Sequence, residues 1–450
     1  MAISNQPQAS SHSETLYKRA LKVMPGGNSR DSVYRSPFPF YAASAKGFVI
    51  TDADGRERID FLNNYTSLIH GHSHPKIVEA VTRQLPFGTA VAMPTEIEIE
   101  LAELLTGRIP SMERIRFVNS GSEAVMMAIK AARGFTNRPK IAKMEGAYHG
   151  SYDFAEISQT SGPDGWGANQ PRSLPVSQGT PQGVLDNVVV LPFNHIEASI
   201  QILDQHRDSI GAVLLDLMPH RVGFLPAAPA FVSALRKWAT DNGALLIFDE
   251  VITVRLGYGG AQERYKDRPD LTAVAKIIGG GFPVGAVGGR ADVMEVFNPS
   301  LAKIPVPHGG TFNANPITMV AGHAAMSLMT PDLFDHINGL GERARKGLAE
   351  AFSVAGVRGQ VTGGGSLFFV HFNDHKLTDY RSGYRDAAER ERVTKLVNKM
   401  LERGFILATT AMGCISTVMS EREVDALCEA FTGAVREMRD EGAFDAARRS

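Results

Sequence analysis

The sequence predicts an α/β protein with a large domain built around a mostly parallel sheet and a smaller α+β domain. Its 450 residues are enough for one large domain with a deep core and a second, smaller domain. From about Pro75 to Asn298, short apolar runs alternate with helical segments, as in parallel sheets that helices cover on both faces. The last third has a different pattern, with one strand and a long amphipathic helix.

Residues 1–75 are expected to complete the smaller domain. Ser11 and Glu14 have the spacing of a helix-capping box, and Pro25-Gly26-Gly27 would end the helix that begins there. The stretch from Phe48 to Phe61, with a turn at Asp54-Gly55, predicts a β-hairpin.

Residues 76–330 are expected to form the large domain. Its predicted strands include Ile115–Val118, Val188–Leu191, Gly211–Leu217 and Ala244–Phe248. A stretch rich in Gly, Ser and Pro, from Ser158 to Gln182, predicts a long surface loop near the site.

Residues 331–450 are expected to supply the rest of the smaller domain. Ser366–Phe372 predicts a strand, and Ser420 with Glu423 would open a helix. The apolar residues of that helix fall on one stripe, made of Val424, Leu427, Phe431, Val435 and Met438.

Composition argues against several classes of function. The formal net charge is −1, from 47 Lys and Arg against 48 Asp and Glu, so we expect neither a nucleic-acid nor a membrane partner. Cys414 and Cys428 lack the spacing of metal ligands and fit a reducing compartment. Residues Met1 to Ser13 are polar, and no apolar run has the length of a membrane span, so the protein is expected in the cytoplasm.

Two acids follow one of the predicted strands. Ala244–Phe248 is apolar, and Asp249 and Glu250 come directly after it. Ligands of open α/β sheets bind at this end of the strands, although a solvated strand end is the alternative for either acid.

A lysine ends the apolar run Leu271–Ala275, and Gly279-Gly280-Gly281 follows it. Burial at this point would lower the pKa of Lys276, and a neutral amine is the form that attacks a carbonyl. The alternative is a lysine that extends from a strand end into solvent.

Two further segments could hold a phosphate. Gly121 and Ser122 lie between the strand ending at Val118 and a predicted helix, where free backbone N–H groups and a hydroxyl suit an anion. A simple N-cap by a serine is the alternative. Thr311, in a glycine-containing segment, offers a second hydroxyl.

An aromatic residue and a group of histidines complete the set. Tyr148, before His149 and Gly150, could cover a flat cofactor or belong to a packed loop. The alternation of His70, His72 and His74 resembles metal ligands, but Gly71 and Pro75 indicate a turn and no partner follows at ligand spacing. We therefore expect no metal.

In combination, these motifs resemble the class III aminotransferases of pyridoxal 5′-phosphate (PLP) fold type I. The matching blocks, in order, are Gly71-His72-Ser73-His74-Pro75, Asn119–Ala124, Tyr148-His149-Gly150, Asp249-Glu250-Val251 and Gly310-Thr311-Phe312. Each block is only moderately specific, whereas their order along nearly the whole chain, with the lysine downstream, is highly specific.

The resemblance implies a role for each matching residue. Lys276 would hold PLP as a Schiff base and later move the substrate proton, and Asp249 would keep the pyridine nitrogen protonated. Tyr148 and Val251 would lie on the two faces of the ring. Gly121 and Ser122 would hold the phosphate, together with Thr311 from the other subunit of a homodimer with shared active sites.

Within the family, the motifs most resemble those of the branch holding glutamate-1-semialdehyde aminomutase and β-amino-acid aminotransferases. Arg30 lies in a segment similar to that branch's substrate loop and is the candidate for binding a substrate carboxylate, with Arg255 a weaker one. The segment Thr409–Cys414 has neither the Glu typical of the aminomutases nor the Arg of β-phenylalanine aminotransferases. Met412 would instead make the pocket more apolar, and Asp216 stands where relatives commonly have Glu.

The predicted function is transfer of an amino group from an amine donor, best a β-amino acid or a hydrophobic amine, to an oxo-acid acceptor by a ping-pong mechanism. An aminomutase or epimerase of the glutamate-1-semialdehyde aminomutase type is the alternative. A second alternative, a non-catalytic binding module with the PLP fold, is disfavoured because Lys276 and Asp249 are both present.

Overall fold

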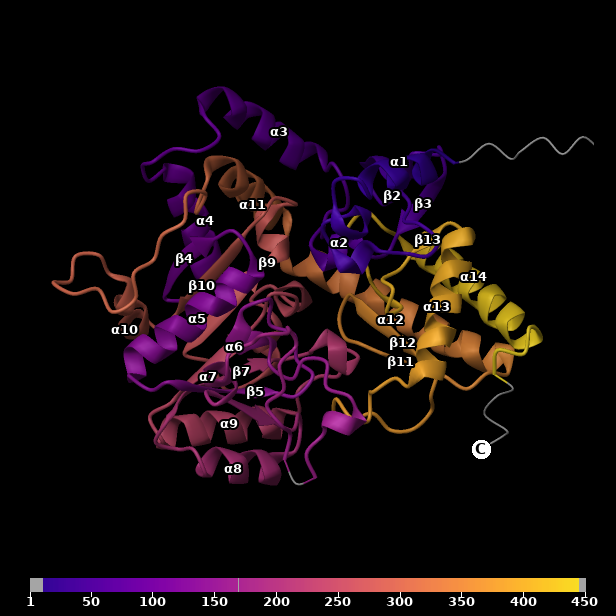
Figure 1. Cartoon of the computed structure of the whole chain (residues 1–450). Coiled ribbons are helices and arrows are strands. Elements are labelled where there is room, and N and C mark those ends of the chain that lie inside the picture. The colour runs from indigo at the N-terminus through magenta and orange to yellow at the C-terminus, as the bar shows by residue number, and fades with distance from the viewer. Residues whose placement is uncertain (1–10, 169, 445–450) are drawn as a thin grey trace, which may run out of the picture.

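The computed structural model describes residues 11–168 and 170–444, and the first ten residues of the polar N-terminal segment lie outside this range. A seven-stranded sheet occupies the larger part of the molecule (Figure 1). Its strands, in spatial order, are β4 (Arg114–Val118), β10 (Gly285–Gly289), β9 (Leu271–Ala275), β8 (Leu245–Asp249), β7 (Ile210–Asp216), β5 (Lys140–Met144) and β6 (Val188–Leu191).

The sheet is mostly parallel, as the sequence predicted. Strands β9, β8, β7, β5 and β6 pair in parallel, whereas β10 is antiparallel to both of its neighbours. The sequence analysis did not predict β10, because Gly285–Gly289 is rich in glycine and lacks the long apolar side chains of the other strands.

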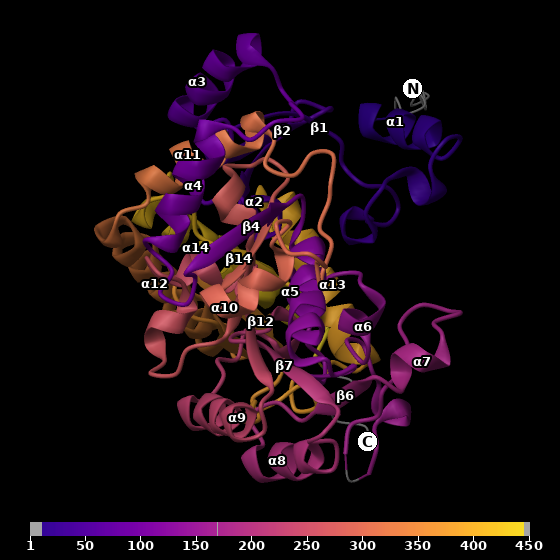
Figure 2. The same ribbon diagram turned by 90° about the vertical axis from the view of Figure 1, so that its left-hand side faces the viewer.

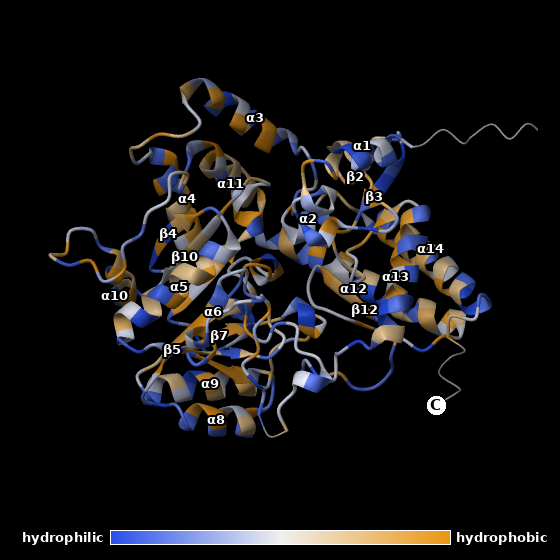
Figure 3. Cartoon of the chain, in the orientation of Figure 1, coloured by the Kyte–Doolittle hydropathy of each residue, from blue (hydrophilic) through white to orange (hydrophobic). Residues whose placement is uncertain are grey.

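Apolar residues on both faces of the strands explain why the sheet is buried. In β7, Ala212 and Leu214 pack toward α5 (Gly121–Thr136), while Val213 and Leu215 pack in the cluster that contains α8 (Ile196–Asp204) and α9 (Pro229–Asp241). Two views at right angles show α8 and α9 side by side, and colouring by hydropathy shows the apolar strands inside (Figures 2 and 3). A strand whose side chains point alternately toward two layers of helices has no polar face.

Segments from both ends of the chain form the smaller part. The strands β2 (Val49–Asp52) and β3 (Glu57–Asp60) form the predicted N-terminal hairpin. The strand β1 (Ala42–Lys46), which was not predicted, pairs with β2, and β13 (Phe405–Ile406) pairs with β3 in parallel. A second sheet joins β11 (Gln360–Thr362), β12 (Leu367–His371) and β14 (Met412–Cys414). The division of the chain into domains at residues 75 and 330 stays a prediction.

Helices cover these small sheets. The helices α12 (Pro331–Ala355) and α14 (Glu421–Asp440) pack together, and α13 (Ala387–Glu402) packs against α14. Ser420 and Glu423 form the predicted capping box of α14, whose five predicted apolar residues are all buried. The remaining helices are α1 (His12–Ala20), α2 (Asn63–Thr66), α3 (Pro75–Gln84), α4 (Glu96–Thr106), α6 (Asp153–Glu156), α7 (Gln182–Leu185), α10 (Ala291–Met294) and α11 (Pro316–Leu328).

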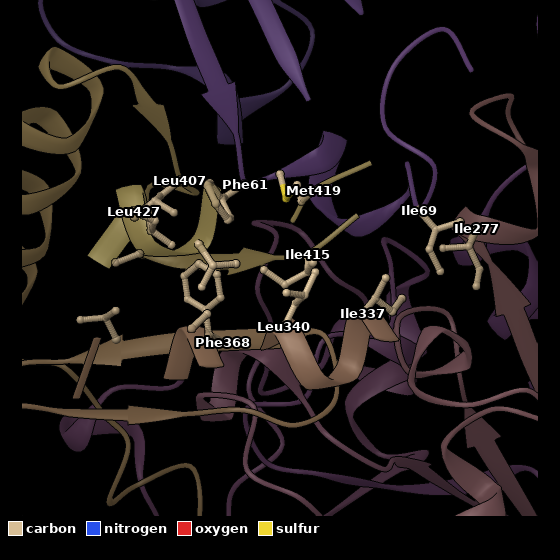
Figure 4. Packing of buried hydrophobic residues seen from close by; sticks show 14 of the residues in the cluster. Phe61, Ile69, Ile277, Ile337, Leu340, Phe368, Leu407, Ile415, Met419 and Leu427 are labelled. Atoms are coloured by element: carbon tan, nitrogen blue, oxygen red, sulfur yellow. The ribbon is translucent and has the colours of Figure 1, made fainter. Parts of the chain in front are cut away.

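One hydrophobic core connects the two parts. Figure 4 shows Phe61, Phe368 and Leu427 of the smaller part in the same buried cluster as Ile69 and Ile277. Since Ile277 directly follows Lys276, this core also fixes the backbone at the predicted site. The structure thus confirms the predicted α/β fold with a mostly parallel sheet and a smaller α+β part.

Candidate active site

The carboxyl ends of the central strands border a cavity of about 320 Å³. Its wall includes Asp216 at the end of β7, Asp249 at the end of β8 and Lys276 directly after β9. This is the edge at which open α/β sheets bind ligands. Other residues that the sequence predicted for cofactor binding line the same cavity, namely Gly121, Ser122, Tyr148 and Val251.

Lys276 directly follows β9 and has a left-handed backbone conformation, with φ of 57°. Burial lowers the pKa of Lys276, while the charges of Asp249 and Asp216 oppose that shift. This direction agrees with the prediction from the apolar run before the lysine. A lowered pKa favours the neutral amine, which is the nucleophilic form.

Asp249 is held from two sides. The backbone N–H of Val251 donates to Oδ1 of Asp249 at 3.0 Å, and Nδ1 of His149 lies 2.7 Å from Oδ2. Burial lowers the pKa of His149, although its contact with Asp249 acts in the opposite direction. His149 Nε2 is buried and has no hydrogen-bond partner among the residues that the structure describes. These two contacts fix the orientation of the Asp249 carboxylate in the wall of the cavity.

Asp216 lies beside Asp249, because these two residues are paired in the register of β7 and β8. Burial raises the pKa of Asp216 well above its ordinary value, and the charge of Asp249 raises it further. The backbone N–H of Met218 donates to Asp216 at 2.8 Å. Two adjacent buried carboxyl groups therefore favour the state in which Asp216 is protonated.

The start of α5 forms a narrow cradle with the loop after Tyr148. Ser120 caps α5 by accepting a hydrogen bond from the N–H of Glu123 at 3.1 Å, so Ser122 is not the N-cap. Gly150 approaches Ser122 so closely that a Cβ at Gly150 would lie 2.4 Å from the Ser122 hydroxyl oxygen. First-turn N–H groups beside this hydroxyl suit an anion such as a phosphate.

Gly121 and Tyr148 shape the cavity between these polar groups. A Cβ at Gly121 would lie 2.8 Å from the side chain of Val251, so glycine lets the helix start approach the strand end. The ring of Tyr148 packs edge-on against His220 with a centroid distance of 5.5 Å. The cavity thus combines a flat apolar wall with an amine, a carboxylate and an anion cradle.

Three residues that the sequence predicted for the site lie outside this cavity. Thr311 is exposed, on the segment between α10 and α11 that extends from the body in Figure 1, and it does not line this cavity. Met412 is buried in the hydrophobic core and is not among the cavity residues. Arg255 is fully buried and donates to Ser366 and to the backbone carbonyls of Thr66 and Ile415.

Arg30 lines a second cavity, of about 580 Å³, next to the first. The two cavities share Asn64, Gly281 and Phe282. Arg30 donates a hydrogen bond to Oδ1 of Asn64 at 3.0 Å. The second wall is otherwise largely apolar, with contributions from Val33, Ile50, Leu62, Leu68, Ile77 and Ile406.

Two of the three histidines near Gly71 have polar partners of their own. His70 is buried between Thr417 and the carbonyl of Ala325, and burial lowers the pKa of His70 to about 4. Nε2 of His72 lies 2.8 Å from Asp60. In residues 11–168 and 170–444, no group of three or more His, Cys, Asp and Glu residues could hold a metal ion.

Sequence reasoning missed several cavity residues. His149 was identified only as part of a motif, and nothing in the sequence indicated its contact with Asp249. Asn64 and Ser67 carry no motif, and they reach the cavity only because α2 turns them toward it.

Comparison with known proteins agrees with this geometry. A family described as aminotransferase class III matches residues 32–435. The chain is 37% identical, over 93% of its length and 97% of the relative's, to glutamate-1-semialdehyde 2,1-aminomutase of Methanothermobacter thermautotrophicus.

Solved structures are similar over nearly the whole chain. An omega-transaminase from Sphaerobacter thermophilus is 53% identical with a TM-score of 0.93, covering 96% of this chain and 99% of that one. A transaminase with PLP bound is 45% identical with a TM-score of 0.88, over 96% and 98% of the chains. A β-phenylalanine aminotransferase from Variovorax paradoxus is 33% identical with a TM-score of 0.85, over 96% and 94%.

Proposed function

The chain belongs to the class III aminotransferase family, and we propose that it transfers an amino group from a β-amino acid or a related hydrophobic amine to an oxo-acid by a ping-pong mechanism. The family and the fold type I architecture agree with what the motifs predicted, and the enzyme is a PLP-dependent aminotransferase. The observation that carries the proposal is the meeting of Lys276 and Asp249 in one cavity.

The residues of the cavity fit PLP. The cradle that Gly150 and Ser122 form would hold the phosphate, and Asp249 would face the pyridine nitrogen. Tyr148 and Val251 would enclose the ring. When bound, PLP supplies a ring that accepts the electrons released at the substrate carbon.

Lys276 has two tasks in this proposal. As a neutral amine of lowered pKa, Nζ would hold the cofactor, and when free of it the same atom would take a proton from the donor and return it. With PLP bound, the carboxylate of Asp249 would supply the negative charge opposite the pyridine nitrogen, with His149 fixing its orientation. Asp216 supports this charge if it stays protonated, because it then adds no second negative charge beside Asp249.

Arg30 would bind the carboxylate of the donor. Its guanidinium lines the cavity next to the cofactor cavity, and the apolar wall there suits a hydrophobic side group. The similarity to a protein named β-phenylalanine aminotransferase supports the same donor class.

We also propose a homodimer in the cytoplasm with Thr311 reaching the partner's phosphate site. Large apolar side chains are exposed at Phe87 (81%), at Met93 (79%) and, next to Thr311 in the sequence, at Phe312 (58%), which supports an interface between copies. Cys414 and Cys428 are free, which fits a reducing compartment. Within the described residues, no helix combines the length and apolar character needed to cross a bilayer.

The aminomutase alternative is favoured by the curated relatives that carry that name. It would return the amino group to the same carbon skeleton and need no separate acceptor. The absence of a Glu in Thr409–Cys414 and the higher identity to an omega-transaminase support the aminotransferase reaction instead.

A half-reaction distinguishes the two. PLP-loaded protein is mixed with β-phenylalanine without acceptor, and the yellow colour and the oxo-acid product are followed. We expect the colour to bleach with about one equivalent of oxo-acid per subunit, since the first half of a ping-pong reaction stops there. Turnover of glutamate-1-semialdehyde without any acceptor, and no reaction with β-phenylalanine, would overturn the proposal.

A further inference from the structure

The turn α2 has an unusual backbone. Four consecutive residues other than glycine, Asn63 to Thr66, have positive φ values of 48°, 46°, 56° and 72°. This conformation is unfavourable for residues with a Cβ, and it persists only where surrounding contacts fix it. Here Asp60 accepts hydrogen bonds from the N–H groups of Leu62 and Asn63, at 2.8 and 3.0 Å.

The turn places Asn64 at the junction of the two cavities, since Asn64 lines both. Its amide orientation follows from its contacts. The Nδ2 group donates to the hydroxyl of Ser67 at 3.1 Å, and Oδ1 accepts from Nη1 of Arg30 at 3.0 Å. The hydroxyl of Ser67 donates in turn to the Asn64 carbonyl at 2.9 Å.

Arg30 has no ion-pair partner in this arrangement among the described residues. Its guanidinium contacts the neutral Oδ1 of Asn64 and lies over the ring of Tyr65, whose centroid is 6.0 Å from Cζ. Asp60 lines the same cavity but is occupied by His72 and by two backbone N–H groups. The guanidinium is therefore oriented without being neutralised.

We propose that Asn64 is a positioning residue that sets the enzyme's preference for donors carrying a carboxylate. Its neutral oxygen aims Arg30 toward the junction and leaves the positive charge for the substrate. This inference rests on the proposed function, because it requires Arg30 to bind the donor's carboxylate.

Substitution of Asn64 by aspartate separates orientation from charge. Asp has the same shape and, like Asn, tolerates left-handed backbone, so the turn can form. Its carboxylate would pair with Arg30 and compete with the substrate's carboxylate. Asn64→Gly suits the same backbone and removes the acceptor without adding a charge.

The test compares two donors that differ only in the carboxylate, β-phenylalanine and 1-phenylethylamine, in PLP-loaded wild type and variants with the same acceptor. For Asn64→Asp, the KM for β-phenylalanine should rise about 10- to 100-fold, as expected for loss of a charge-assisted hydrogen bond. The kcat should change little, and both constants for 1-phenylethylamine should stay within about threefold. Asn64→Gly should raise the KM for β-phenylalanine by about three- to tenfold.

Each outcome decides a different point. If wild type does not deaminate β-phenylalanine at all, the proposed function fails. If wild type does and the ratio of the two donors' KM values is unchanged in both variants, Asn64 does not set the preference. Equal losses for both donors would show that Asn64 merely supports the fold, which also overturns the inference. If Asn64→Asp does not fold or retain cofactor, Asn64→Gly alone decides.

Discussion

The two neighbouring cavities differ in how their polar groups are held. In the cofactor cavity, Asp216, Asp249 and Lys276 end three adjacent strands of a buried sheet, and core residues flank each of them. In the second cavity, Arg30 lies on an exposed segment and depends on a single hydrogen bond to Asn64.

The difference separates chemistry from selectivity. Groups at the ends of packed strands can move little, which suits an amine and a carboxylate that must act with any donor. The orientation of a guanidinium that only one side chain holds can be changed by few substitutions. We therefore expect variants of the first cavity to abolish reaction with all donors, and variants of the second to redistribute activity among donors.

The strongest test of the first cavity is Lys276→Ala. We expect turnover with every donor to fall by at least about 10⁴-fold, because in the proposed mechanism one atom both holds the cofactor and moves the proton. Steady-state rates with β-phenylalanine and 1-phenylethylamine measure the effect. Lys237→Ala, which removes an exposed lysine paired with Asp241, is the control and should keep activity. Substantial turnover in Lys276→Ala would contradict the assignment.

Asp249→Asn tests the charge opposite the ring. The amide keeps the shape but loses the negative charge, so kcat should fall by roughly 10²- to 10³-fold for both donors, in line with the loss of one electrostatic contact in an active site. Cofactor content, measured by absorbance after release, should remain near one per subunit. A loss confined to β-phenylalanine would instead assign Asp249 to donor selection.

The same contrast explains what the sequence could predict. The strand ends were predictable because wholly apolar runs indicate buried parallel strands. The carboxyl ends of such strands meet at one edge of the sheet, so the residues that follow them lie close together there. Lys276, Asp249 and the start of α5 were all found in this way. The antiparallel strand β10 was not predicted, since its glycines give no apolar pattern.

The second cavity could not be predicted from local pattern. Asn64 reaches it through a left-handed turn that long-range contacts hold, such as the hydrogen bond from Asn63 to the carbonyl of Cys414 at 3.2 Å. Met412 is the reverse case. Its place in the chain suggested a pocket residue, but the pairing of β14 with β12 turns it into the core.

Lys143→Met tests how the rigid region is supported. The fully buried Lys143 donates to the carbonyls of Ala147 and Ile157, at 3.0 and 2.6 Å, and so holds the loop that carries Tyr148. Leaving two buried carbonyls without donors should cost about 2–4 kcal/mol in the free energy of unfolding and weaken PLP retention. Denaturant unfolding measures the cost, with Lys140→Met on the same strand as control.

The pH dependence of this variant has a defined sign. Burial lowers the pKa of Lys143 from 10.5 to about 7 in the folded chain. Between these values the unfolded chain holds a proton that the folded chain has released, so this group makes the wild type more stable as pH rises. The stability difference between wild type and Lys143→Met should therefore widen from pH 7 to 10. A difference that stays constant over this range would show that Lys143 keeps its proton in the folded chain.

The smallest expected effect concerns Met412, which the sequence suggested as a donor contact. Its side chain is 3% exposed and packs in the core, so Met412→Leu should cost less than about 1.5 kcal/mol of unfolding free energy, as for other swaps of similar volume. The KM ratio of β-phenylalanine to 1-phenylethylamine should not change, because the residue lies outside both cavities. Met400→Leu, another buried methionine, calibrates the stability cost. A shifted ratio would mean that donor selection extends through β14 into the core. The contrast between a rigid reaction site and an adaptable carboxylate site would then not be enough to explain which donors react.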